Sequence, residues 1–203
     1  MTSPFEQIAP EYAALWSETA RGQVQREQVW RELDARFHAG DRVLDLGCGT
    51  GDDAVHLKAR GVEVLGIDSA AGMVEIARAR GVVSRRMAIE DIGTLQAKFD
   101  GAISNFGALN CVADLAAVSR ELSRLVRPNG TLAVCVMSRY CVSDWRHLMQ
   151  RWSGHSRWRG IDVYYRSTRS IVRSFAPAFE WTRRVSISRG DHQLLLFRRR
   201  LEC

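Results

Sequence analysis

The sequence predicts an α/β fold centred on a parallel sheet, and two observations carry this prediction. From residue 42 onward, short apolar runs alternate with segments of helical period, which is typical of parallel strands joined by right-handed crossover helices. The apolar run at 43–46 leads into a loop that holds three glycines at alternate positions. Because ligands bind beyond the carboxyl ends of the strands in such sheets, this loop is the expected binding site.

The first forty residues predict helices that precede the sheet. An amphipathic stripe of helical spacing, interrupted by Pro10, is formed by Phe5, Ile8, Tyr12, Leu15 and Trp16. A second helix is expected at 22–38, and Gly40 follows it as a helix stop. Beyond it we expect strands at 42–46, 62–67, 82–87, 99–104 and 130–137, helices at 52–60, 70–80 and 112–126, and a short turn near 91–97.

The glycine loop favours a ligand other than a dinucleotide. Asp52 stands where the dinucleotide fingerprint G-x-G-x-x-G has its third glycine, and Asp53 follows it. Two carboxylates at the start of a helix disfavour a pyrophosphate and suit a ligand with cationic groups. Asp68 ends the second apolar run, where its carboxylate is placed to accept hydrogen bonds from a ribose diol.

Several segments appear together in an order and spacing typical of one family. They are the loop at 43–51, Asp68, and the segments 90–92, 99–105 and 125–132. With them the chain resembles a class I S-adenosylmethionine-dependent methyltransferase of the small, stand-alone kind that acts on small molecules. The resemblance implies a Rossmann-like, seven-stranded, mostly parallel sheet with helices on both faces and a C-terminal antiparallel hairpin, which 179–188 and 191–199 fit. The 203 residues then form one domain, with a lid at 1–38, a cofactor core at 39–137, an acceptor-site insertion at 138–178 and the hairpin at 179–203.

The resemblance also implies S-adenosylmethionine as the cofactor and S-adenosylhomocysteine as its product. The backbone at Gly47, Gly49 and Gly51 is expected to pass along the methionine and ribose portions. Asp45 beneath the loop either orders the turn or meets the ammonium group of the cofactor. Asp68 is expected to bind the ribose hydroxyls, with a helix N-cap for 70–80 as the structural alternative. The other expected cofactor residues are Tyr12 of the lid, Cys48, Ser69 and Met73 beside the adenine, Ile89, Glu90 and Asp91 at the adenine edge, and Asn105 and Phe106.

The adenine edge departs from the family pattern. Ala88 stands where relatives carry the acid that accepts from the exocyclic amine of adenine. Either Glu90 or Asp91 replaces that acid, or the amine meets water or backbone.

The expected reaction needs no fixed catalytic motif. Methyl transfer from a sulfonium depends on position and on a dry site, and a base is needed only if the nucleophile must lose a proton. His147 and His155 are the candidates for such a base. The loop after the fourth strand lacks the prolines of enzymes that methylate planar nitrogens, which argues against nucleobase methylation and leaves Asn105 and Phe106 to line the transfer site. The histidines and cysteines do not cluster as a metal site.

Charge and aromatic residues concentrate in the last third of the chain. Residues 1–138 carry 15 basic and 18 acidic side chains, whereas residues 139–203 carry 14 and 5. Seven arginines alternate with tryptophan and tyrosine between Arg139 and Arg169, a stretch that includes Trp145, Trp152 and Trp158. We expect this stretch to form the wall of a site for a small acceptor that is anionic or aromatic. An RNA-binding methyltransferase that tracks phosphates and stacks bases is the first alternative, and a non-catalytic cofactor-binding module is the second.

The remaining features predict a cytoplasmic protein. No run of 18 apolar residues is present, so no membrane span is expected. The first residues lack the basic and apolar regions of a secretory signal. Five cysteines, an odd number without metal-like spacing, fit reduced thiols. The oligomeric state and the attacked atom of the acceptor stay open.

Overall fold

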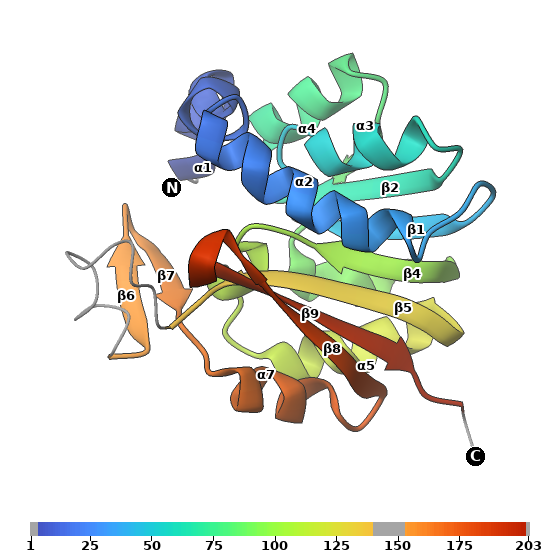
Figure 1. The fold of residues 1–203 in the computed structure, drawn as a ribbon. Helices are drawn as coiled ribbons and strands as arrows, with labels where there is room; N and C mark the ends of the chain where they lie inside the picture. The colour runs from blue at the N-terminus through green and yellow to red at the C-terminus, as the bar shows by residue number, and fades with distance from the viewer. Residues whose placement is uncertain (1–3, 140–152, 202–203) are drawn as a thin grey trace.

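The computed structural model describes residues 4–139 and 153–201, which form a seven-stranded sheet with helices on both faces (Figure 1). The strand order is β3-β2-β1-β4-β5-β9-β8. The first five of these strands are parallel, whereas β9 runs antiparallel to both β5 and β8. The strands are β1 (Arg42–Leu46), β2 (Glu63–Asp68), β3 (Val83–Arg86), β4 (Phe99–Ser104), β5 (Val126–Met137), β8 (Phe179–Ile187) and β9 (His192–Arg199). The predicted fold class is therefore confirmed.

The helices divide between the two faces because the central strands are apolar on both. In β1, Val43 packs toward α2, whereas Leu44 and Leu46 pack into the core beneath α5. Figure 1 shows α2 (Ala20–Asp34), α3 (Asp52–Lys58) and α4 (Ala71–Ala79) on one face, and α5 (Leu115–Leu125) and α7 (Thr168–Phe175) on the other. No helix in the described ranges is long and apolar enough to span a membrane.

Several boundaries differ from the prediction because side chains cap the helices. The helix expected at 112–126 begins at Leu115, since Asp114 accepts hydrogen bonds from the Ala116 and Ala117 N–H groups at 2.9 and 3.0 Å. The helix expected at 22–38 begins at Ala20, where Thr19 accepts from the Gly22 N–H. The turn near 91–97 is a 3₁₀-helix, η3 (Ile89–Thr94).

The predicted N-terminal helix is broken into three short pieces. They are α1 (Pro4–Ile8), the 3₁₀-helix η1 (Ala9–Glu11) and the π-helix η2 (Ala13–Ser17). Pro10 explains the break, because proline lacks the N–H that a continuous helix requires. We call residues 4–17 the N-terminal strap.

The segment 138–178, the expected acceptor-site insertion, contains secondary structure that the sequence analysis did not predict. They are the two-stranded hairpin of β6 (His155–Trp158) and β7 (Ile161–Tyr164), and helix α7. The hairpin lies beyond the carboxyl end of the parallel strands, on the same side as α1 (Figure 1). It is fixed by Asn110, whose side chain donates to the Tyr164 carbonyl at 2.8 Å and accepts from the Met137 N–H at 2.9 Å.

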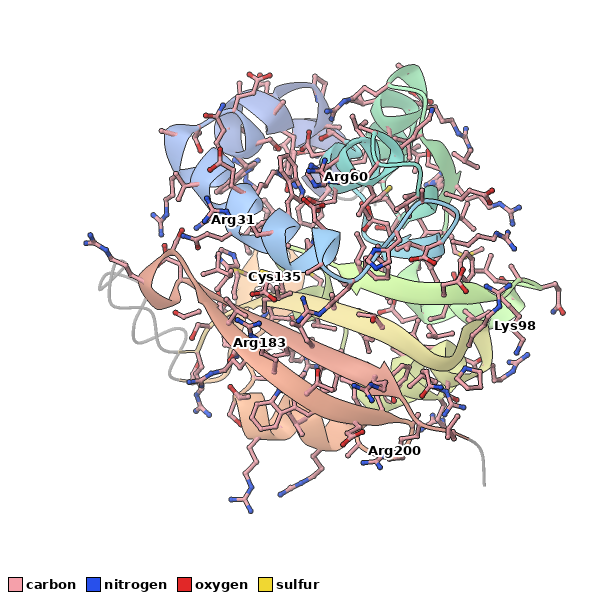
Figure 2. All side chains as sticks on the ribbon, turned by 45° about the vertical axis from the view of Figure 1, so that its right-hand side comes forward. Arg31, Arg60, Lys98, Cys135, Arg183 and Arg200 are labelled. Atoms are coloured by element: carbon pink, nitrogen blue, oxygen red, sulfur yellow. The ribbon has the colours of Figure 1, made fainter. Side chains whose placement is uncertain are left out.

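The basic charge is spread over the molecule. Figure 2 shows Arg31 on α2, Arg60 after α3, Lys98 before β4, Arg183 on β8 and Arg200 after β9 at well-separated places. The edge strand β8 is exposed at residues 180–184. Arg183 and Arg184 lie on this exposed part of β8.

Phe175→Ala is expected to destabilise the fold strongly. Phe175 is fully buried, with its ring centroid 6.1 Å from that of Phe179 and 5.3 Å from that of Phe197. Truncating such a side chain costs about 3–5 kcal/mol, which urea unfolding measures. Leu201→Ala is the control, because Leu201 is 65% exposed and should lose no more than about 0.5 kcal/mol. Similar losses in the two variants would contradict the position of this core.

Candidate functional site

The glycine loop after β1 folds back against β2. The Gly47 and Cys48 N–H groups both donate to the Ile67 carbonyl at 2.9 Å. Gly47, Gly49 and Gly51 have φ values of 74°, 53° and 85°, a conformation that side chains disfavour. A Cβ on Gly47 would lie 2.3 Å from the Ala108 Cβ, whereas a Cβ on Gly49 would meet nothing within 4 Å. Gly47 is therefore needed for packing, and Gly49 presents bare backbone to open space.

Asp68 joins the glycine loop to the start of α4. One oxygen accepts from the Gly49 N–H at 3.0 Å and the other from the Ala70 N–H at 2.9 Å. Burial raises the pKa of Asp68, and these backbone donors oppose the rise. The N-cap position of α4 is Ala70, so the alternative that Asp68 is the N-cap residue is wrong. Glu6 of the N-terminal strap instead accepts from Ala71 and Gly72 at 2.7 and 2.8 Å.

The two acids at the start of α3 are paired within the protein. Arg26 of α2 lies 3.1 Å from Asp52 and 3.0 Å from Asp53, and Arg80 lies 2.7 Å from Asp52. Although burial alone would raise the pKa of Asp52, Arg26, Ser17 and Arg80 lower it. The prediction that these acids suit a cationic ligand therefore needs correction, because guanidinium groups already occupy them.

Two polar side chains beside the loop are buried and incompletely paired. Asp45 is 1% exposed and Asn105 is 7% exposed. The Asn105 amide donates to Asp53 at 3.0 Å, but within the described residues Asp45 Oδ2 and Asn105 Oδ1 have no hydrogen-bond partner. Burial and the negative charge of Asp53 raise the pKa of Asp45, with smaller rises from Asp68 and Asp52, and Arg26 opposes them.

The N-terminal strap places Tyr12 over this cluster. Tyr12 packs against Ala70 and Met73 at the start of α4. Burial raises the pKa of Tyr12, the charge of Arg26 opposes the rise, and Asp52, Asp53 and Asp68 add to it. The structure thus places Tyr12 beside the start of α4, and its contact with the cofactor stays a prediction.

The expected adenine residues have mixed environments. Met73 is 1% exposed and packs under Ile8 and Ala9 of the strap, whereas Ser69 is exposed. Ile89 is buried near the glycine loop, and the side chains of Glu90 and Asp91 are exposed.

Two cysteines near the loop differ in orientation. The Cys48 sulfur packs against Gly66 of β2, where an added Cβ would lie 2.8 Å away, so it serves strand packing. Burial raises its pKa well above the usual range. Cys111 was not predicted as a site residue. Its thiol lies 3.8 Å from the Gly107 carbonyl oxygen, and burial, with smaller rises from the charges of Glu90 and Asp68, raises its pKa to about 11.

Phe106 lies at the end of β4 between residues that the sequence analysis missed. Its φ of 53° is a strained value for a residue with a side chain. Its ring stands edge-on to His192 at 5.6 Å, and the Arg26 guanidinium lies 4.9 Å from its centroid. Arg26 and Trp30 are four residues apart on the face of α2 that also buries Val29. Arg26 could have been predicted from the sequence because it is a charged residue on the helix face that carries Val29 and Trp30. No local sequence pattern of this kind indicates His192.

The hairpin and the strap meet above the site. The Trp158 ring lies 5.6 Å from that of Phe5. Arg166 donates to the Val112 and Ala113 carbonyls at 2.6 and 2.7 Å, and its guanidinium lies 4.7 Å from the Tyr164 ring. Arg166 therefore holds the hairpin to the loop after β4.

The structure describes one of the two base candidates. The His155 ring lies 3.0 Å from Asp162 on the exposed hairpin, with half of its side-chain surface open to solvent. His147, Trp145 and Trp152 lie outside the described residues.

Comparisons with known proteins agree with the family that the sequence motifs indicate. A family model described as a methyltransferase domain matches residues 18–178. The demethylmenaquinone methyltransferase of Clavibacter sepedonicus is 29% identical over an alignment of 170 residues, and the match covers 78% of this chain and 64% of that protein. The 2-phytyl-1,4-naphtoquinone methyltransferase of Synechococcus elongatus is 33% identical over an alignment of 150 residues, and the match covers 66% of this chain and 62% of that protein. The chain thus spans less than two thirds of the length of these curated relatives.

Solved structures share the fold. An S-adenosylmethionine-dependent methyltransferase from Mesorhizobium loti has a TM-score of 0.70 at 20% identity, covering 84% of this chain and 97% of its own. DhpI in complex with SAH has a TM-score of 0.74 at 18% identity, covering 98% of this chain and 94% of its own. At such low identity these likenesses show the fold alone, and they confirm the Rossmann-like prediction.

Asp45→Asn is expected to stabilise the ligand-free protein at neutral pH. Folding raises the pKa of Asp45 above its ordinary value of about 3.9. Its contribution to stability is therefore complete below that value and is lost as the pH rises through the raised pKa. The variant cannot ionise at this position, so its advantage over the wild type should grow from about pH 4 to pH 8.

Urea unfolding at these pH values measures the effect, with exposed Glu75→Gln as the control. An advantage of Asp45→Asn that does not change with pH would contradict the raised pKa.

Proposed function

We propose, from the premise that this chain belongs to the methyltransferase domain family, that it transfers a methyl group from S-adenosylmethionine to a small, ring-bearing acceptor. One observation carries the cofactor part of this proposal. The backbone at Gly49 faces open space in the loop that follows Asp45, and the buried atoms Asp45 Oδ2 and Asn105 Oδ1 have no partner in the described residues. A site of this kind suits an extended ligand that approaches bare backbone and donates hydrogen bonds.

The residues of the site fit the adenosyl cofactor. Gly47, Gly49 and Gly51 form a backbone cradle, and Asp68, which is mostly buried, holds the cradle through the Gly49 N–H. Asp45 and Asn105 supply acceptors for an amino group. The adenine edge is assigned to Ile89 and Glu90, with Cys111 beside them.

The chemistry of the reaction belongs mainly to the cofactor, whose sulfonium supplies an activated methyl group when it is bound. The protein contributes position and exclusion of water. The N-terminal strap closes one side through the bonds of Glu6 to α4. The β6–β7 hairpin closes another side of the site through the contact of Trp158 with Phe5. Such positioning can supply about 7–11 kcal/mol of the barrier.

The acceptor is proposed to be aromatic rather than strongly anionic. Phe5, Trp158 and Phe106 provide ring surfaces around the carboxyl end of the sheet. Of the arginines around this site, Arg166 is committed to backbone carbonyls, and Arg26, 4.9 Å from the Phe106 ring, is committed to Asp52 and Asp53. The curated relatives are named for quinone acceptors, which agrees with a flat, ring-bearing substrate. The four arginines labelled in Figure 2 lie on separate elements, which does not favour a nucleic-acid track.

Gly49→Ala is expected to block cofactor binding. The methyl group would enter the open space beside the loop, and affinity for S-adenosylhomocysteine should fall at least tenfold, about 1.4 kcal/mol. Calorimetry measures this, and NAD should not bind the wild type. Gly40→Ala is the matched control, because Gly40 also has a positive φ, of 92°, and open space around its Cβ, but lies before β1 at the opposite end of the strand.

Both variants should lose about 1–2 kcal/mol of stability through the left-handed conformation. Equal affinity of the two variants for S-adenosylhomocysteine would refute the placement of the cofactor.

Trp158→Ala is expected to raise KM for an aromatic acceptor while cofactor affinity is unchanged. The assay uses a reduced 1,4-naphthoquinone at saturating S-adenosylmethionine, and loss of a ring contact of about 0.5–1.5 kcal/mol corresponds to a rise of roughly 2- to 12-fold. Trp181→Ala is the control, since Trp181 is similarly exposed but lies on β8. An unchanged KM in Trp158→Ala would remove the hairpin from the acceptor site.

A further inference from the structure

The face of the sheet that α5 covers is open at the edge strand β3. The crossover from β3 to β4 carries the short 3₁₀-helix η3 in place of an α-helix. Burial falls along one row of neighbouring residues across the sheet. Leu44 of β1 is fully buried, Leu65 of β2 is partly buried, and Val83 of β3 is 69% exposed. The layer of side chains that covers this face therefore ends at β2.

A cavity of about 670 Å³ lies where this layer ends. Its lining on this face is apolar and consists of Leu65, Val83, Leu95, Ala97 and Phe99. Cavities that bind small molecules usually measure about 300–1,000 Å³ and have mainly apolar walls with a few polar groups. The size and the lining of this cavity therefore suit a small organic ligand.

The charged residues around the cavity favour an anion. Among the described residues, its lining includes three cations and one anion, which are Arg42, Lys58, Arg85 and Glu63. Arg42 lies 3.4 Å from Glu63, and Lys58 donates to the Gly81 carbonyl at 2.7 Å. Arg85 has no hydrogen-bond or ion-pair partner within 4–139 and 153–201. Its guanidinium group is therefore available to a ligand.

The strand β3 places this guanidinium beside the apolar wall. Arg85 follows Val83 by two residues, so the two side chains share a face of the sheet. A ring that lies over Val83 and Leu65 can therefore direct an acidic substituent toward Arg85. The planar guanidinium group binds carboxylate and phosphate oxygens through two parallel N–H groups.

The cavity is separate from the proposed cofactor site. It includes Glu63 at the amino end of β2, whereas Asp68 and the glycine loop lie at the carboxyl end. Five residue steps along a strand span about 16 Å. The described residues that line the cavity include none of those assigned to the cofactor or to the acceptor. A molecule bound here is therefore not placed for methyl transfer.

We propose that this cavity is a second binding site, which takes a small, flat, ring-bearing anion. The ring lies against Leu65 and Val83, and the anionic group binds Arg85. The site does not depend on the proposed function, because its residues and its ligand are different.

The test uses two fluorescent probes with one ring skeleton. 8-Anilino-1-naphthalenesulfonate carries an anionic group, and N-phenyl-1-naphthylamine is the same skeleton without it. Both are titrated into the full chain at saturating S-adenosylhomocysteine. Arg85→Gln should weaken the sulfonate probe about fivefold, the loss of one partly exposed ion pair, and should leave the neutral probe within about twofold. Arg85→Lys keeps the charge and should recover most of the affinity.

Val83→Glu tests the apolar wall with a second variant. It places a negative charge beside the sulfonate and should weaken that probe about tenfold. Arg31→Gln and Val24→Glu are the matched controls, because both residues are exposed but lie on α2. They should leave both probes unchanged. Thermal unfolding checks that each variant folds, and if Val83→Glu does not, the two Arg85 variants decide the outcome.

Three results would overturn the inference. The first is an unchanged affinity of the sulfonate probe in both Arg85→Gln and Val83→Glu. The second is an equal loss of both probes in Arg85→Gln, which would show an apolar surface without anion recognition. The third is a loss of the sulfonate probe in Trp158→Ala but not in Arg85→Gln, which would place the probe in the proposed acceptor site. A wild type that does not bind S-adenosylhomocysteine would instead refute the proposed function, and the probe titrations would still decide this inference.

Discussion

The buried carboxylate of Asp53 is the constraint on which the arrangement of the site depends. Its three donors come from Arg26 and Trp30 of α2 and from Asn105 at the end of β4, so one side chain joins two helices and the sheet. A buried charge is tolerated only when it is paired and hydrogen-bonded. Any displacement of α2 would leave that charge unpaired, and the helix is therefore positioned by polar geometry as well as by the apolar contacts of Val29 and Leu33.

The segments that enclose the site are held in a similar way, by polar groups that act on backbone. Glu6 satisfies the first N–H groups of α4, Asn110 joins the end of β5 to β7, and Arg166 binds the Val112 and Ala113 carbonyls before α5. Ring contacts such as that of Phe5 with Trp158 then close the remaining gap. The strap and the hairpin are far apart in the sequence, yet both are hydrogen-bonded to the same cofactor core.

The parts of the fold that local sequence could predict are those with short-range signals. The strands from 42 to 137 and the glycine loop were predicted because apolar runs and glycines encode them directly. The role of Asp52 and Asp53 was misread because their partner Arg26 lies in an earlier helix. The hairpin at 155–164 was missed because its two-residue turn, with positive φ at both residues, carries Arg159 before Gly160 instead of the usual asparagine or aspartate. His192 reaches Phe106 only through the pairing of β9 with β5.

The two edge strands share a feature that bears on the behaviour of the protein at high concentration. The outermost strands β3 and β8 each carry two adjacent arginines, Arg85-Arg86 and Arg183-Arg184, and all four are exposed. An open strand edge offers unpaired backbone groups to a second chain, and charged residues there discourage such pairing. Edge-to-edge association of two copies through the same strand would bring like charges together across the new ladder. The arginines thus disfavour growth of the sheet from either end into an aggregate.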